Sequence, residues 1–271
     1  MAASSRQRLE AARRRQDEKQ LRARVAALPA PPVPRFSEHA FGLIAEVKRR
    51  SPAEGQLASA SLSPVAQAGL YAQAGALAVS VLTEPERFAG SLEDLEAVAG
   101  ALPGLAVMRK DFLVDGYQVL EARAAGAAGV LLIAAMLEPA RLEAMLALAL
   151  ELGMFALVEV FGHDDLAACS RLVTSAARTP AGSGRVLLGV NCRDLRTLQV
   201  DYARFAALAP ALPRGLPRVA ESGIASPAQA GEVAALGYSL ALVGTALMRA
   251  ADPGTAAQAL LAAGRAALPE E

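Results

Sequence analysis

The chain has 271 residues, with equal numbers of basic and acidic residues (27 each) and 54% hydrophobic residues. Its length suits one large domain or two small ones, with a core large enough to need no disulfides. Zero net charge and the absence of Trp argue against nucleic acid as a partner. The two cysteines, Cys169 and Cys192, cannot form a disulfide framework, so we expect a reducing, cytoplasmic compartment.

The N-terminal segment is rich in Arg and lacks the apolar region of a secretory signal. A mitochondrial transit peptide is an alternative that Glu10, Asp17 and Glu18 weaken. No run of eighteen apolar residues occurs, so we expect no membrane partner. We predict an exposed amphipathic helix that ends at the Pro-rich stretch 29–34, within a helical extension (residues 1–40) packed on the domain formed by 41–271. The apolar side of this N-terminal helix comprises Leu9, Leu21, Val25 and Leu28.

From residue 42 onward, a short apolar run, a polar loop and a longer Ala- and Leu-rich segment recur roughly every 20 to 35 residues, the size of one βα unit. We predict eight strands, at residues 43–47, 77–82, 105–108, 129–133, 156–160, 186–190, 217–220 and 240–243. This pattern predicts an α/β fold, a single (β/α)8 TIM barrel. A doubly wound open sheet is the main alternative, although neither GxGxxG nor GxxxxGK[ST] is present to indicate dinucleotide or P-loop chemistry.

Capping residues and glycines predict where several helices begin and end. Serines that precede Pro or acidic residues are expected to cap helix N-termini at Ser63, Ser91 and Ser226. Glycines that follow helical segments are expected to end helices at Gly100, Gly126, Gly153 and Gly237.

The predicted strands end in polar residues, and a barrel carries its function at the carboxyl ends of its strands. Because strand side chains alternate between faces, Glu46 shares a face with Lys48, and Lys110 points inward while Arg109 faces the helices. With Glu159, these side chains would form a mixed cluster that separates pKa values and supplies both an acid and a base. The alternative is a set of buried ion pairs without chemistry.

The segments after the last two strands predict a phosphate site, because barrels often bind phosphate there. Ser222-Gly223 and Gly244-Thr245 offer hydroxyls and backbone N–H groups that an anion can approach. The two histidines, His39 and His163, lie outside any metal-ligand spacing, so we expect no metal. No GxSxG motif is present to support a hydrolase triad.

These motifs, in combination and in order, resemble those of the indole-3-glycerol phosphate synthase family. The resemblance extends from about residue 5 to 265 and includes extra helices before the barrel. Its motifs are IAEVKRRSP (44–52), SVLTE (80–84), MRKDF (108–112), LVEV (157–160), GVNCRDL (189–195), AESGI (220–224) and VGTALM (243–248).

The resemblance implies a carboxy-lyase of tryptophan biosynthesis that uses no cofactor and no metal. It would close the ring of 1-(2-carboxyphenylamino)-1-deoxyribulose 5-phosphate and release carbon dioxide and water. Lys110 matches the general acid of ring closure, and Glu159 matches the acid–base group of dehydration. Lys48 matches the residue that contacts the substrate carboxylate, and Glu46 would hold Lys48 or act as a base; how the proton transfers divide among these four residues stays open.

The resemblance also implies catalytic contributions from the polar residues Asn191 and Glu221. It implies a substrate-binding set made of Ser51, Phe88, Phe112, Leu131, Ile133, Arg193, Leu195, Ser222, Gly223, Gly244 and Thr245. Within this set, the two Phe residues, Leu131 and Ile133 would form an apolar wall for the anthranilate ring.

Four residues at three sites depart from the family pattern. Thr245 replaces a usual Ser and keeps its hydroxyl, and Cys192 replaces a usual Asn or Ser. Ala53-Glu54 stand where Ser-Lys is common, and the loss of that cation is expected to weaken substrate capture.

The alternative functions are another phosphate-binding barrel, such as phosphoribosylanthranilate isomerase or the tryptophan synthase α subunit, and a non-catalytic metabolite-binding barrel. The expected partner is the phosphorylated small molecule; we expect a monomer, with a weak dimer as the alternative.

Overall fold

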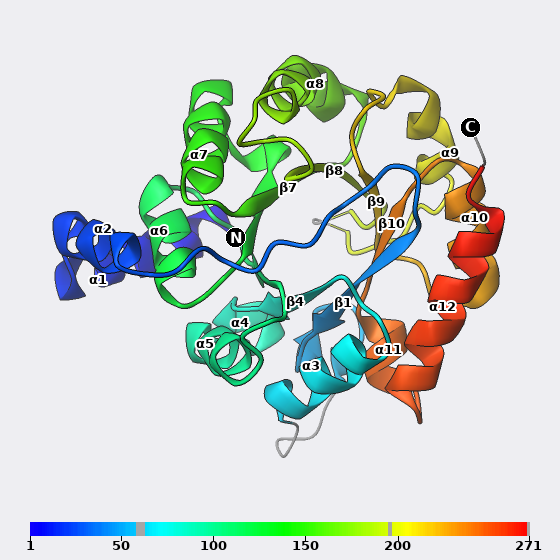
Figure 1. Ribbon diagram of the computed structural model, residues 1–271, viewed down its shortest axis with the longest axis horizontal. Helices are drawn as coiled ribbons and strands as arrows, with labels where there is room; N and C mark the ends of the chain where they lie inside the picture. The colour runs from blue at the N-terminus through cyan, green and yellow to red at the C-terminus, as the bar shows by residue number, and fades with distance from the viewer. Residues whose placement is uncertain (58–62, 195–196, 270–271) are drawn as a thin grey trace.

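The computed structural model describes residues 1–57, 63–194 and 197–269 (Figure 1). Eight parallel strands close into a barrel in the order β1-β4-β5-β6-β7-β8-β9-β10, which confirms the predicted architecture and excludes the open sheet. The strands are β1 (Gly42–Val47), β4 (Ala78–Leu82), β5 (Val107–Lys110), β6 (Gly129–Ile133), β7 (Phe155–Val160), β8 (Val186–Asn191), β9 (Arg218–Glu221) and β10 (Leu240–Val243).

Two details of the strands differ from the prediction. The third barrel strand, β5, lies two residues further along the chain than expected, because Lys110 pairs in register with Leu82 and its carbonyl accepts the Thr83 N–H. A short antiparallel hairpin of β2 (Arg50–Ser51) and β3 (Gly55–Gln56) follows β1 and was not predicted, since two-residue strands leave no periodic pattern.

Helices surround the barrel as a ring (Figure 1). The longer ones are α3 (Pro64–Gln73), α5 (Leu92–Ala101), α6 (Gly116–Ala124), α7 (Pro139–Glu151), α8 (His163–Ala177), α10 (Pro227–Ala235) and α12 (Pro253–Ala267). The shorter ones are α4 (Pro85–Phe88), α9 (Arg204–Leu208), α11 (Thr245–Arg249) and the 3₁₀ turns η1 (Ala134–Met136) and η2 (Ala209–Ala211). No helix in the described ranges is long and apolar enough to cross a membrane.

Most predicted helix boundaries are confirmed. Side-chain oxygens accept a hydrogen bond from the N–H three residues later at Ser63, Ser91 and Ser226. Glycines with positive φ follow the C-caps of α6, α7 and α10 at Gly126, Gly153 and Gly237. The prediction for Gly100 is wrong: it lies inside α5, which continues to Ala101 because the Leu102 N–H still bonds the Val98 carbonyl.

The barrel has two apolar layers. Side chains such as Ile44, Met108 and Leu157 fill its interior, and a larger layer lies between the strands and the ring of helices. As predicted from strand alternation, Lys110 shares the inward face with Met108, whereas Arg109 binds Glu121 of the helix layer. The interior is thus closed by apolar residues below, and the polar side chains lie above them at the strand ends.

The N-terminal segment forms two helices instead of the single exposed helix that we predicted: α1 (Ala2–Arg15) and α2 (Glu18–Ala26). The chain breaks at Gln16 because Asp17 caps the second helix by accepting the Gln20 N–H. Both helices pack beside α6, where they bury Leu9, Leu21 and Val25 and leave Leu28 half-buried (Figure 1). Burial of this apolar side stabilises the pair on the barrel.

Candidate active site at the carboxyl ends of the strands

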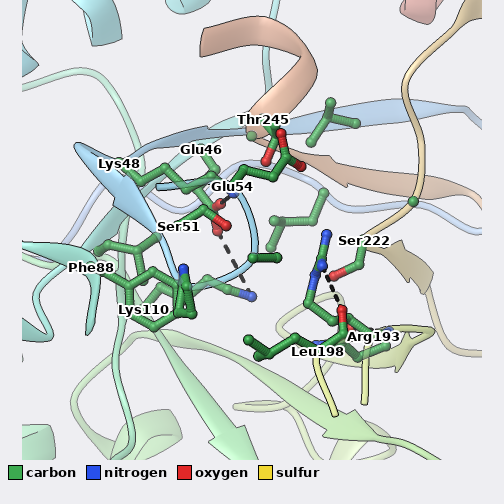
Figure 2. A pocket seen from close by; sticks show the side chains of 18 of the residues that line it. Glu46, Lys48, Ser51, Glu54, Phe88, Lys110, Arg193, Leu198, Ser222 and Thr245 are labelled. Carbon is green, nitrogen blue, oxygen red and sulfur yellow. Dashed lines mark hydrogen bonds and ion pairs between the residues drawn. The ribbon is translucent and has the colours of Figure 1, made fainter. Parts of the chain in front are cut away.

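A cavity of about 540 Å³ opens at the carboxyl ends of the barrel strands (Figure 2). It brings together most of the predicted site: Glu46, Lys48, Ser51, Phe88, Lys110, Phe112, Leu131, Ile133, Glu159, Asn191, Arg193, Ser222, Gly223, Gly244 and Thr245. Of the other two residues, Glu221 lies behind the lining, and Leu195 lies outside the described residues.

Lys110, the last residue of β5, stands among three carboxylates. Its Nζ lies 3.0 Å from Glu221 Oε2, 3.7 Å from Glu159 Oε2 and 3.9 Å from Glu46 Oε2. Burial alone would lower the pKa of Lys110, but the attraction of Glu221, Glu159 and Glu46 outweighs it and raises the pKa. The lysine is therefore an ammonium at neutral pH, with a proton to give at the cavity surface.

Glu46 and Lys48 form a second ion pair at the end of β1. Their side chains share a face of the strand, as predicted, and Lys48 Nζ lies 2.8 Å from Glu46 Oε1. Burial favours the neutral form of Glu46, but Lys48 and Lys110 lower its pKa. Gly244 makes room for this carboxylate, because a Cβ at that position would lie 2.3 Å from Glu46 Oε1. Glu46 is thus a fixed anion that links the two lysines.

Glu159 is the carboxyl of the cluster whose pKa is raised. It is 1% exposed, and burial together with the neighbouring Glu221 raises its pKa to about 8, although Lys110 opposes the shift. Asn191 Nδ2 donates to Glu159 Oε2 at 3.1 Å, and Asn191 Oδ1 accepts the Arg193 N–H at 2.9 Å. This chain of hydrogen bonds fixes the orientation of Glu159 toward the cavity.

Glu221 lies beneath Lys110 and is fully buried. One of its oxygens accepts from Lys110, and the other, Oε1, has no hydrogen-bond partner among the described residues. Gly189 of the neighbouring strand gives it space, because a Cβ there would lie 2.1 Å from Glu221 Oε1. Glu221 therefore does not line the cavity itself; it binds Lys110 and raises the pKa of Glu159.

One side of the cavity offers groups for an anion. Ser222 and Gly223 follow β9 with φ values of 68° and 74°, which turn the chain sharply at the cavity wall. Gly244 and Thr245 follow the adjacent strand β10, where Gly244 caps the short helix α11. Figure 2 shows the Ser222 and Thr245 side chains on the same rim as Arg193, whose guanidinium donates to the Leu198 carbonyl at 2.9 Å.

An apolar wall faces this rim. The rings of Phe88 and Phe112 lie 6.4 Å apart, and Leu131 and Ile133 of β6 continue the surface into the barrel. Such a surface accommodates a flat aromatic ring and excludes water, which strengthens the charged contacts beside it. The cavity therefore brings together an apolar wall, a cluster of lysines and glutamates, and a rim of hydroxyl and backbone groups that could bind an anion.

Sequence reasoning missed several lining residues. Leu198 and Val200 of the loop after β8 border the cavity, as does Arg249 at the end of α11. Arg249 forms an ion pair of 2.9 Å with Glu54, one of the positions that depart from the family pattern. The sequence signal for these residues is weak because they lie several positions beyond a strand end. There the geometry of the loop decides which side chains line the cavity.

Comparisons with known proteins identify the family that these residues resemble. A family model described as "Indole-3-glycerol phosphate synthase" matches residues 1–260. Proteins with that name from Parafrankia sp. and Micrococcus luteus are 50% and 47% identical over 211 and 262 residues, which cover 78% and 94% of this chain and 74% and 93% of theirs. A solved 3-hexulose-6-phosphate synthase from Salmonella typhimurium shares the fold, with a TM-score of 0.61, 17% identity, and coverage of 82% of this chain and 98% of its own.

Proposed function

The chain belongs to the indole-3-glycerol phosphate synthase family, and on that premise we propose that the cavity binds 1-(2-carboxyphenylamino)-1-deoxyribulose 5-phosphate with Lys110 as the general acid of ring closure. The observation that carries this assignment is the Lys110 ammonium among three carboxylates, between an aromatic wall and an anion-binding rim. A ring, a reacting carbonyl and a phosphate occur in that order along the substrate.

The substrate enters with its two ends fixed. Its carboxyphenyl ring lies against Phe88 and Phe112, and its phosphate meets the hydroxyls and backbone N–H groups at Ser222 and Thr245. Lys48 attracts the ring carboxylate. Holding both ends brings the ring carbon close to the ribulose carbonyl, which lowers the entropic part of the barrier. All of these side chains come from one chain, so we propose a monomer as the working form.

Ring closure begins when the ring carbon that bears the carboxylate attacks the ribulose carbonyl. The nitrogen supplies electrons, and Lys110 gives a proton to the carbonyl oxygen, which becomes a hydroxyl. The carboxylate then leaves as carbon dioxide, and its electrons restore the aromatic ring. The contacts of Lys110 Nζ with Glu159 and Glu221 keep this nitrogen near the reacting oxygen before and after the transfer.

Dehydration follows in the same cavity. Because the pKa of Glu159 is about 8, this carboxyl carries a proton at neutral pH and gives it to the departing hydroxyl, which leaves as water. The Lys110 amine, left neutral by the first step, takes the proton lost from the adjoining carbon and becomes an ammonium again. One proton from solvent restores Glu159 and closes the cycle.

The test is an assay of indole formation by fluorescence, with the purified protein and the carboxyphenylamino-deoxyribulose phosphate in buffer that contains EDTA. The wild-type protein should turn the substrate over. Lys110→Met should lower kcat about 100-fold or more, the scale for a lost general acid. Lys19→Met, which removes an exposed lysine of α2, is the matched control and should not change kcat. A folded wild-type protein without turnover, or normal turnover by Lys110→Met, would refute the proposal.

A further inference from the structure

Asp111 follows Lys110 directly at the end of β5, and its buried carboxylate borders the cavity. It accepts hydrogen bonds from Thr83 Oγ1 at 2.8 Å, from Arg109 at 3.2 Å and from the Phe112 N–H at 2.8 Å. This one carboxylate therefore determines how the chain leaves the strand between Lys110 and Phe112.

The strongest partner of Asp111 comes from the N-terminal helix α1. Arg8 donates from both terminal nitrogens, each at 2.7 Å, to the two oxygens of Asp111. Burial would raise the pKa of Asp111, but Arg8 and Arg109 hold it at about 2, so the group is always ionised near neutral pH. A bidentate guanidinium–carboxylate pair fixes direction as well as distance.

A second buried carboxylate performs the same task on the other ring of the wall. Glu84 borders the cavity and caps α4 by accepting the N–H groups of Glu86, Arg87 and Phe88 at 3.3, 2.7 and 3.3 Å. The negative charge of Glu84 also helps to raise the pKa of Arg8. The backbone N–H groups of both wall residues are thus bound by carboxylates, one paired with Arg8 and the other close enough for its charge to act on Arg8.

We propose that Arg8 is a positioning residue of the active site: it holds Asp111, and through it the Phe112 side of the aromatic wall, and it balances the charges of Asp111 and Glu84 beside an anionic substrate. This inference rests on the proposed function. The Phe88 and Phe112 rings, 6.4 Å apart, are where the substrate ring is expected to bind. Loss of Arg8 would let the wall shift. It would also remove one of the two arginines bound to Asp111 and the positive charge that acts on Glu84, so binding of an anionic substrate should suffer more than chemistry.

The experiment compares Arg8→Met with Arg8→Lys and with a matched control, Arg13→Met. Arg13 lies on the same helix and forms a similar 2.8 Å ion pair, but with the partly exposed Asp115 at the start of α6. Arg8→Met should raise KM about tenfold or more with a smaller change in kcat. The reason is that a small displacement of groups that position the substrate weakens its productive binding by at least this factor. Arg8→Lys, which keeps the charge without the bidentate geometry, should give an intermediate KM.

Inorganic phosphate is the probe that separates local positioning from general destabilisation. It should inhibit competitively at the Ser222 and Thr245 rim, on the other side of the cavity, and its inhibition constant should be the same in all four proteins. An unchanged KM in Arg8→Met, an equal rise in the phosphate constant, or an equal rise of KM in Arg13→Met would overturn the inference. Should Arg8→Met not fold, a wild-type KM in Arg8→Lys would overturn it. Absence of turnover in the wild-type protein would instead refute the proposed function.

Discussion

Glu159→Gln should make the protein more stable at neutral pH and nearly inactive. The substitution keeps the shape of the side chain and an oxygen that accepts from Asn191, but it removes the proton that we assign to dehydration. Loss of this acid should lower kcat about 100-fold or more. The gain in stability follows from the proton equilibrium of the wild-type residue.

The magnitude comes from the raised pKa of Glu159. In the folded protein this carboxyl holds its proton up to about pH 8, whereas its ordinary value is 4.5. Because the folded pKa is the higher one, the contribution of Glu159 to stability is complete below pH 4.5, falls as pH rises, and levels off above pH 8. Each pH unit in this window corresponds to about 1.4 kcal/mol, so the wild-type protein loses about 3 kcal/mol between pH 5 and pH 7.5 that the Gln variant does not lose.

The assay is urea unfolding of both proteins, followed by far-ultraviolet circular dichroism at pH 5, 6, 7 and 7.5. The difference in unfolding free energy between variant and wild type should grow steadily with pH in favour of the variant. Groups that titrate elsewhere cancel in this difference, among them Asp111, whose pKa is about 2. A difference that is constant from pH 5 to pH 7.5 would show that Glu159 is ionised throughout and would refute its role as proton donor.

Two further substitutions test the cluster from other sides. Lys48→Ala should raise KM more than it lowers kcat, because Lys48 is assigned to the substrate carboxylate; steady-state kinetics with an unchanged kcat/KM would remove it from the site. Gly189→Ala should destabilise the fold by about 1–3 kcal/mol, because the added Cβ would lie 2.1 Å from Glu221 Oε1. Thermal unfolding measures that loss, and a wild-type Tm would mean that Glu221 moves freely.

The barrel could be predicted from the sequence because parallel strands buried on both faces appear as short apolar runs. The inward direction of Glu46, Lys48 and Lys110 also followed, since strand alternation and the position of barrel active sites are local rules. The rules place the side chains at one end of the barrel. They do not say which carboxylate touches which lysine.

What remained beyond prediction depends on contacts between distant segments. Arg8 and Asp111 are 103 residues apart, and no periodic pattern signals their pair. The break between α1 and α2 depends on one capping residue, Asp17, inside a segment whose composition is helical throughout. The complete burial of Glu221 follows from the missing side chain of Gly189 on the adjacent strand, which is visible only once the register is known.

The charges of the cluster favour a proton on one of its carboxyls. Among the described residues, the ion pairs of Glu46, Glu159 and Glu221 are made with Lys48 and Lys110, while Arg193 acts on Glu46 from further away. With all three carboxylates ionised, this group of five side chains would carry a net negative charge beside the carboxylate of the substrate. A proton on Glu159 makes the group neutral, which removes that repulsion. The same proton is the one that dehydration consumes. Admission of the anionic substrate and supply of the acid thus depend on a single ionisation, and activity should fall as Glu159 loses its proton above about pH 8.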